Sequence, residues 1–228
     1  VAWISLLRPQ VKKSTLSKYL NLLENYIFPY FSNICIQNIT HEIIQAHCNE
    51  LLSVGGIRHH GLSPKTVSDV LSVIRNILKY AETIGIPVPC DGHTVRIKQR
   101  HKDLKVLSQN EQDILLAYLR ANPTNINMGI MLCLFTGLRV GEICALRWDD
   151  ISLSDKTIYV HQTMQRVQNK NNDLPKTSVV ITTPKSTCSI RLIPLPDVLT
   201  QLMSESCTSK AGYFIASNEH SIVEPRTM

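Results

Sequence analysis

The sequence lacks any apolar run as long as the roughly 18 residues that a membrane-spanning helix needs. Its first residues lack the basic segment followed by an apolar one that marks a secretory signal. No Cys-x-x-Cys pair occurs, and the seven cysteines are an odd number, so neither a disulfide framework nor a cysteine zinc site is indicated. The 228 residues, 43% of them hydrophobic, can bury the core of one large domain or two small ones. These features predict a reduced, cytoplasmic globular protein.

The net positive charge lies mostly in the first half of the chain. The net charge is +6, and residues 1–104 hold 12 basic and 7 acidic residues, whereas residues 105–228 hold 12 and 11. The densest basic run comprises Arg96, Lys98, Arg100, Lys102 and Lys105. Such a run can neutralise nucleic-acid phosphates and release counterions. A solvated linker kept soluble by its charge remains the alternative.

The first hundred residues carry helical patterns only. Leu16, Leu20, Leu23 and Ile27 form one apolar stripe that Ser14 or Thr15 could cap. Thr40 can cap a second helix that ends at Gly55, and Ser63 followed by Pro64 is a strong start signal for a third, which Gly85 ends. We therefore expect a helical domain over residues 1–87 and a basic linker over 88–104.

The second part, residues 105–228, begins with a capping-box pattern from Ser108 to Glu111. Residues 126–136 are apolar nearly all round and predict a buried helix that Gly137 ends. The sequence pattern then changes from helical spacing to short β-prone segments. Residues 157–160, 178–182 and 189–193 predict three strands of one sheet. The expected fold is mainly α with a small three-stranded antiparallel β-sheet, an α+β arrangement.

One arginine stands at the start of a helix in an apolar setting. An unpaired charge at Arg139 would cost several kcal/mol, so an anionic group should meet it. Glu142 lies three residues on, on the same helical face, and can hold the guanidinium in place. The rest of the guanidinium could then bind a phosphate bidentately. A purely structural Arg–Glu pair is the alternative.

The surrounding residues favour the first interpretation. Residues 136–151 read Thr-Gly-Leu-Arg-Val-Gly-Glu-Ile-Cys-Ala-Leu-Arg-Trp-Asp-Asp-Ile, which resembles the first catalytic box of the tyrosine recombinase (phage integrase) family. The resemblance implies that Arg139 contacts the scissile phosphate and that Glu142 is a supporting residue.

A second stretch resembles the β-hairpin of that family. It runs from Thr182 through Pro184, Lys185 and Ser186 to Arg191 and Pro194. The resemblance implies that Lys185, in the turn, is a general acid, and a lysine on a turn can protonate a departing 5′-oxygen. Alone, Lys185 would be interpreted as a solvated turn residue.

The N-terminal helices resemble the core-binding, SAM-like domain of the same family. Ser63, Lys65 and Thr66 would open a helix whose N-terminus suits phosphate contacts. A simple capped surface helix remains the alternative for each of these residues. Together with Arg96, Lys98 and Arg100 they are the predicted DNA-binding residues.

The sequence departs from the family pattern after Lys185. The family's second box, His-x-x-Arg, and its nucleophilic tyrosine are expected there, but His220 is followed by Ser-Ile-Val, and Tyr213 stands before any second box. The His-x-x-Arg at residues 93–96 lies upstream, in the expected linker, and we interpret it as coincidental. We therefore expect the catalytic domain to stop before its nucleophile and the chain alone to leave DNA uncleaved.

The resemblance implies site-specific DNA recombination or integration for a mobile element. Its partner would be double-stranded DNA, with no cofactor, metal or small-molecule substrate, because the bond energy is conserved in a 3′-phosphotyrosyl link. The full-length parent would act as a DNA-bound tetramer and the free chain would be monomeric. Two alternatives are a non-catalytic, sequence-specific DNA-binding protein of the same family and a helical interaction domain unrelated to DNA.

Overall fold

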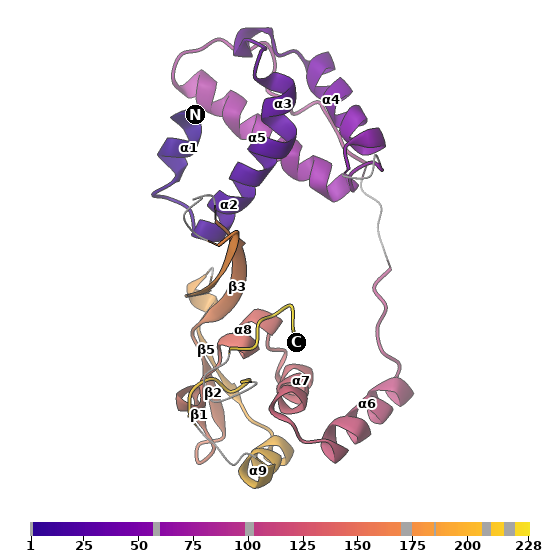
Figure 1. Ribbon diagram of the computed structural model, residues 1–228, viewed down its shortest axis with the longest axis vertical. Helices are drawn as coiled ribbons and strands as arrows, with labels where there is room; N and C mark the ends of the chain where they lie inside the picture. Colours follow the sequence, from indigo (N-terminus) through magenta and orange to yellow (C-terminus); the bar gives the residue numbers. More distant parts are fainter. Residues whose placement is uncertain are drawn as a thin grey trace. The chain divides into compact units, whose positions relative to one another are not determined.

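A computed structural model of the protein describes residues 2–56, 60–98, 103–169, 175–184, 186–206, 211–216 and 222–228. The chain divides into two compact units, residues 1–104 and residues 105–228, whose helices and strands are drawn in Figure 1. Each unit has its own hydrophobic core.

The described residues of the first unit form helices and loops, with no strand among them. Its elements are α1 (Ala2–Leu7), α2 (Lys13–Leu22), η1 (Leu23–Ile27), α3 (Phe28–Phe31), η2 (Ile36–Asn38), α4 (His41–Val54) and α5 (Pro64–Thr83). Lys12 is the N-cap residue of α2, so the predicted caps Ser14 and Thr15 lie inside the helix and that prediction is wrong. The helix also continues through the π-helical turn η1 into α3, which contains Pro29. A proline ring clashes with the preceding turn of a regular helix, and the wider turn occurs at that point.

Helix α5 is the central helix of this unit's core. Ser63 caps it, with its Oγ accepting the N–H of Thr66, and Pro64 is its first residue, as predicted. Val67 and Val70 of α5 are fully buried. Part of the expected linker also packs on this core, because Val95 is buried and Arg75 donates hydrogen bonds to the carbonyls of Gly92 (3.0 Å) and Val95 (2.7 Å).

His47 is a buried polar residue in the same core. Its ring lies 4.3 Å from the ring of Tyr30 and 5.1 Å from that of Phe31, measured between centroids. Neither ring nitrogen has a hydrogen-bond partner among the described residues. Burial lowers the pKa of the His47 imidazole, and the backbone of Tyr26 and the carboxylate of Glu50 oppose that effect only in part.

We expect the first unit to lose stability in mild acid because of His47. A histidine whose pKa is lower in the folded state than its ordinary value of 6.5 binds a proton more readily when unfolded. Its contribution is therefore fully present above pH 6.5 and declines as the pH falls below that value, by at most about 1.4 kcal/mol per pH unit. Urea unfolding between pH 8 and 5 measures it, followed by Trp3 fluorescence in a Trp148→Phe background in which Trp3 is the sole tryptophan. His47→Phe should remove this decline, and the exposed His93→Gln control should retain it. An identical decline in His47→Phe would assign the effect to other groups.

The second unit combines helices with short strands. Its helices are α6 (Gln109–Ala121), α7 (Asn125–Thr136), α8 (Val140–Ala145), η3 (Trp148–Asp150), η4 (Thr187–Ser189) and α9 (Asp197–Ser206). The predicted capping box of α6 is present, with Ser108 and Glu111 bonded reciprocally. Helix α7 is not buried all round as predicted, because Leu134 and Phe135 are exposed while Met131 and Leu132 face the core.

The strands form two sheets. They are β1 (Ile151–Ser152), β2 (Thr157–Val160), β3 (Thr163–Gln168), β4 (Thr177–Thr182) and β5 (Arg191–Pro194). A three-stranded antiparallel sheet has the order β1-β2-β5, and β3 and β4 form a separate antiparallel ribbon. The three-stranded sheet is thus present, but residues 178–182 do not belong to it as predicted. They pair with β3, for which no strand was predicted, and the two-residue β1 takes the third place.

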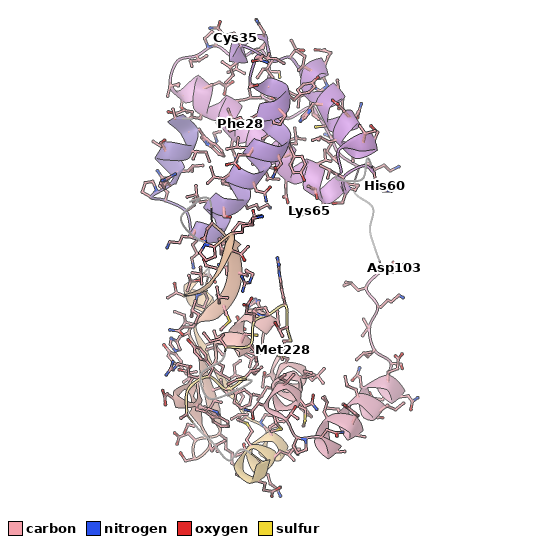
Figure 2. All side chains as sticks on the ribbon, viewed as in Figure 1. Phe28, Cys35, His60, Lys65, Asp103 and Met228 are labelled. Atoms are coloured by element: carbon pink, nitrogen blue, oxygen red, sulfur yellow. The ribbon has the colours of Figure 1, made fainter. Side chains whose placement is uncertain are left out.

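The segment 211–216 closes the core of the second unit. The N–H of Phe214 donates to the carbonyl of Leu146 (2.8 Å), and the buried Phe214 ring lies edge-on to Trp148, with the ring centroids 4.9 Å apart. Met228, labelled in Figure 2, also packs against this core.

Two glycines shape the chain around Arg139. Gly137 ends α7 in the left-handed conformation, with a φ of 68°, which side chains disfavour. Gly141 lies in α8 against strand β3, where a Cβ atom would stand 2.7 Å from the Met164 carbonyl oxygen and 2.7 Å from the Thr163 Oγ1 atom. Helix α8 therefore approaches β3 backbone to backbone.

Candidate functional site

Arg139 is the N-cap residue of α8. The left-handed turn at Gly137 reverses the chain out of α7, Leu138 is buried beside it, and the extended backbone of Arg139 leads into the helix. The Arg139 side chain is 71% exposed. The local sequence thus fixes the arginine backbone between the buried Leu138 and the start of α8 and leaves the side chain accessible.

Glu142 is the carboxylate that holds Arg139, as predicted. Its side chain is 3% exposed; Oε2 accepts the Arg139 backbone N–H (3.0 Å) and Oε1 accepts Nη1 of the Arg139 side chain (2.7 Å). Burial opposes ionisation of Glu142, but hydrogen bonds from Arg191 and Arg139 outweigh it and lower the pKa of the carboxyl.

Arg191, on β5, is a second cation on the same carboxylate. Its Nη2 lies 3.0 Å from Glu142 Oε2 and its Nη1 lies 3.3 Å from Oε1. The sequence patterns did not identify this residue as part of the site. The available signal was a charged residue at the head of an otherwise apolar strand, but the pairing spans 49 positions of the chain and no local pattern reveals such a partner.

The predicted general acid, Lys185, lies outside the described residues. Its neighbours belong to the connection between β4, which ends at Thr182, and β5, which starts at Arg191. Within this connection the Ser189 N–H donates to the Ser186 carbonyl (3.0 Å), and the Ser189 carbonyl accepts Nη1 of Arg191 (3.0 Å). Arg191 therefore joins the end of the turn to Glu142.

A second cationic cluster surrounds the start of α5 in the first unit. The Ser63 hydroxyl lies 2.9 Å from that of Thr66. Asp69 accepts Lys65 Nζ (3.1 Å) and, from α2, Lys18 Nζ (2.8 Å). Burial opposes ionisation of Asp69, but these hydrogen bonds outweigh it and lower its pKa. Both lysine side chains remain exposed, and Figure 2 labels Lys65 at this end of the helix.

The basic run follows an anchored segment. Arg96 and Lys98 are exposed, and they come directly after Val95, whose carbonyl is held by Arg75. Arg100 lies outside the described residues. The structure therefore describes six of the side chains predicted to contact DNA. Five lie in the first unit, Ser63, Lys65, Thr66, Arg96 and Lys98, and Arg139 lies in the second.

No other reactive cluster is present in the parts of the chain described here. They contain no group of three or more histidine, cysteine and acidic residues that could hold a metal ion. Burial raises the pKa of Cys48 and of Cys144 to about 11, so neither is a thiolate nucleophile near neutral pH. None of the described helices is long and apolar enough to span a bilayer.

Comparison with known families assigns the chain. The Phage integrase family profile matches residues 105–213, and the profile for the phage integrase N-terminal SAM-like domain matches residues 2–52. The chain belongs to the phage integrase family. The predicted family and the predicted mainly α fold with a small antiparallel sheet are both confirmed.

Two curated relatives show how much of an integrase this chain spans. The ICEBs1 integrase of Bacillus subtilis (strain 168) is 27% identical over 184 residues, covering 80% of this chain and 46% of the relative. A tyrosine recombinase XerC-like protein of Caldanaerobacter subterraneus subsp. tengcongensis is 26% identical over 215 residues, covering 89% and 52%. The chain thus spans about half the length of the curated relatives it matches.

Solved integrase structures share the fold. A Tn1549 transposon integrase in complex with a circular intermediate DNA superposes with a TM-score of 0.76 at 15% identity, over 99% of this chain and 73% of the other. A lambda integrase tetramer bound to a Holliday junction gives a TM-score of 0.66 at 18% identity, over 99% and 62%. At these identities the likeness establishes the phage integrase fold.

Proposed function

We propose that this phage integrase chain binds double-stranded DNA through both units and supplies Arg139 and Lys185 to the phosphodiester exchange of site-specific recombination. The observation that supports this most strongly is the Arg139 guanidinium, exposed to solvent while a buried carboxylate fixes it from one side. A guanidinium held in this way can bind a phosphate with its remaining donors.

The proposed reaction is a transesterification. A tyrosine oxygen attacks the scissile phosphorus, a 3′-phosphotyrosyl bond forms, and the bond to the 5′-oxygen breaks. Arg139 stabilises the charge on the pentacoordinate phosphorus, and Lys185 donates the proton that the departing 5′-oxygen takes up. Because one phosphoester replaces another, no external energy source is needed. After Lys185 this sequence contains no His-x-x-Arg, and we do not assign the attacking oxygen to Tyr213, the tyrosine that follows Lys185. Arg139 and Lys185 are the two members of the catalytic set that we assign to this chain.

The first unit contributes affinity rather than chemistry in this proposal. Ser63 and Thr66 present the N-terminus of α5, Lys65 extends from its first turn, and Arg96 and Lys98 follow the anchored Val95. Each of these groups suits a backbone phosphate, which orients a protein on DNA without reading sequence. We place this binding in the cytoplasm, with a monomeric free chain that joins a tetramer on DNA in the context of the full-length parent.

Salt titration tests the DNA-binding part of the proposal. We expect Lys65→Gln/Arg96→Gln/Lys98→Gln to reduce the slope of log affinity against log salt concentration by about 3, roughly one for each cation that no longer neutralises a phosphate. Fluorescence anisotropy with a labelled duplex of random sequence measures it. The matched control, Arg8→Gln/Lys79→Gln/Arg120→Gln, removes the same charge from exposed positions elsewhere and should change the slope much less. Equal changes of the slope in the two variants would show that the effect depends on net charge alone. That result would contradict the proposed DNA contacts of Lys65, Arg96 and Lys98.

A non-catalytic DNA-binding protein of the same family is the second candidate. It requires only the phosphate-contact residues of the first unit and none of the chemistry assigned to Lys185. It predicts the same salt dependence as the first candidate. In the full-length context, however, Lys185→Ala would then leave the protein's activity unchanged, whereas the proposed chemistry requires a strong loss of strand cleavage.

A further inference from the structure

Arg191 occupies a position that the proposed chemistry does not yet explain. Its side chain is 29% exposed, and its guanidinium forms a two-point ion pair with Glu142, one nitrogen to each carboxylate oxygen. The same guanidinium donates to the carbonyl of Ser189, at the end of the turn that follows β4. Arg191 is therefore bonded both to the partner of Arg139 and to the connection that contains position 185.

The Glu142 carboxylate has no capacity left for a further partner. It accepts four hydrogen bonds: two from Arg139, through the backbone and the side chain, and two from Arg191. A carboxylate offers about four lone-pair sites. The two arginines thus fix both oxygens, and the plane of the carboxylate is set by Arg191 as much as by Arg139.

We propose that Arg191 is a positioning residue that aligns the Arg139 guanidinium, through Glu142, for its phosphate contact. This inference rests on the proposed function, because aligning the Arg139 side chain affects DNA binding only if Arg139 contacts DNA. Without Arg191, one edge of the carboxylate loses its donors, the carboxylate can rotate, and the long, exposed Arg139 side chain is no longer held in one orientation. The turn after β4 loses its anchor at Ser189 by the same change.

A guanidinium is required for this task. An arginine presents a planar fork that matches both carboxylate oxygens, whereas a lysine ammonium is a single point charge on a flexible stem. Lysine at position 191 would keep the charge near Glu142 but lose the two-point geometry. This difference separates alignment from simple charge compensation.

The test is a double-mutant cycle read by DNA affinity. Arg139→Ala is introduced into the wild-type chain, into Arg191→Met and into Arg166→Met, and each affinity for a labelled random duplex is measured at one salt concentration. Arg166 is the matched control: it lies on β3 of the same unit, is also 29% exposed, and pairs with Glu224. We expect Arg139→Ala to weaken binding about tenfold in the wild type and in Arg166→Met, and less than about twofold in Arg191→Met.

The outcomes separate this inference from the proposed function. If Arg139→Ala has no effect on DNA affinity in the wild-type chain, Arg139 does not contact DNA. Both the proposed function and this inference then fail. If it weakens binding equally in all three backgrounds, Arg191 acts only on stability and the inference alone is overturned. Should Arg191→Met fail to fold, as judged by circular dichroism, Arg191→Lys replaces it. The effect of Arg139→Ala must then be clearly smaller than in the wild type, and an undiminished effect overturns the inference.

Discussion

Glu142→Gln is expected to destabilise the second unit by about 3 kcal/mol. The carboxylate is 3% exposed and accepts four hydrogen bonds from two arginines. A glutamine of the same size loses the charge and directs an amide NH2 group toward a guanidinium. Removing one partner of a buried ion pair costs roughly 3–5 kcal/mol, because the remaining charge is left uncompensated. The lower end applies here, since the Arg139 side chain can reach solvent.

Urea unfolding in a Trp3→Phe background measures this loss, because Trp148 in the second unit is then the sole tryptophan. Glu111→Gln is the matched control: Glu111 occupies the same third position of helix α6, but it is exposed, and glutamine also supports a capping box. We expect little change there. A similar small change for Glu142→Gln would mean that the two arginines do not depend on this carboxylate.

The same carboxylate contributes to the acid sensitivity of the second unit. Its pKa is lowered in the folded protein from an ordinary value of 4.5. Its stabilising contribution is therefore present above that value and is lost as the pH falls through the folded pKa. Glu142→Gln should accordingly unfold with a weaker dependence on pH below 4.5 than the unchanged chain.

Phe214→Ala is expected to cost about 3–5 kcal/mol of unfolding free energy. The ring is fully buried, packs edge-on against Trp148 and belongs to a segment hydrogen-bonded to Leu146. Truncating a buried phenylalanine loses its transfer free energy and leaves a cavity. Phe135→Ala, at an exposed position of α7, is the control and should cost much less. Urea unfolding followed by Trp148 fluorescence compares the two. Comparable losses would show that residues 211–216 do not form part of the core.

Local features of this fold were readable from the sequence, and long-range pairings were not. The caps at Ser63 and Ser108 depend on atoms within one helical turn, and both were predicted correctly. The Arg139–Glu142 pair also lies within one turn. The predicted sheet for residues 178–182 was wrong. These residues pair with β3, whose polar and apolar residues alternate too weakly for the segment to be recognised as a strand. Arg191 was missed for the same reason, since its carboxylate partner is distant in the sequence.

The two glycines on either side of Arg139 tolerate different replacements. At position 137 the requirement is a backbone angle, and asparagine can meet it at modest cost. At position 141 the requirement is volume, because even a single methyl group would collide with the carbonyl of Met164. A shift of β3 must therefore move α8 with it, because the two backbones lie too close together at Gly141 to absorb the displacement. The orientation of Arg139, at the start of α8, therefore depends on β3 as well as on the turn at Gly137.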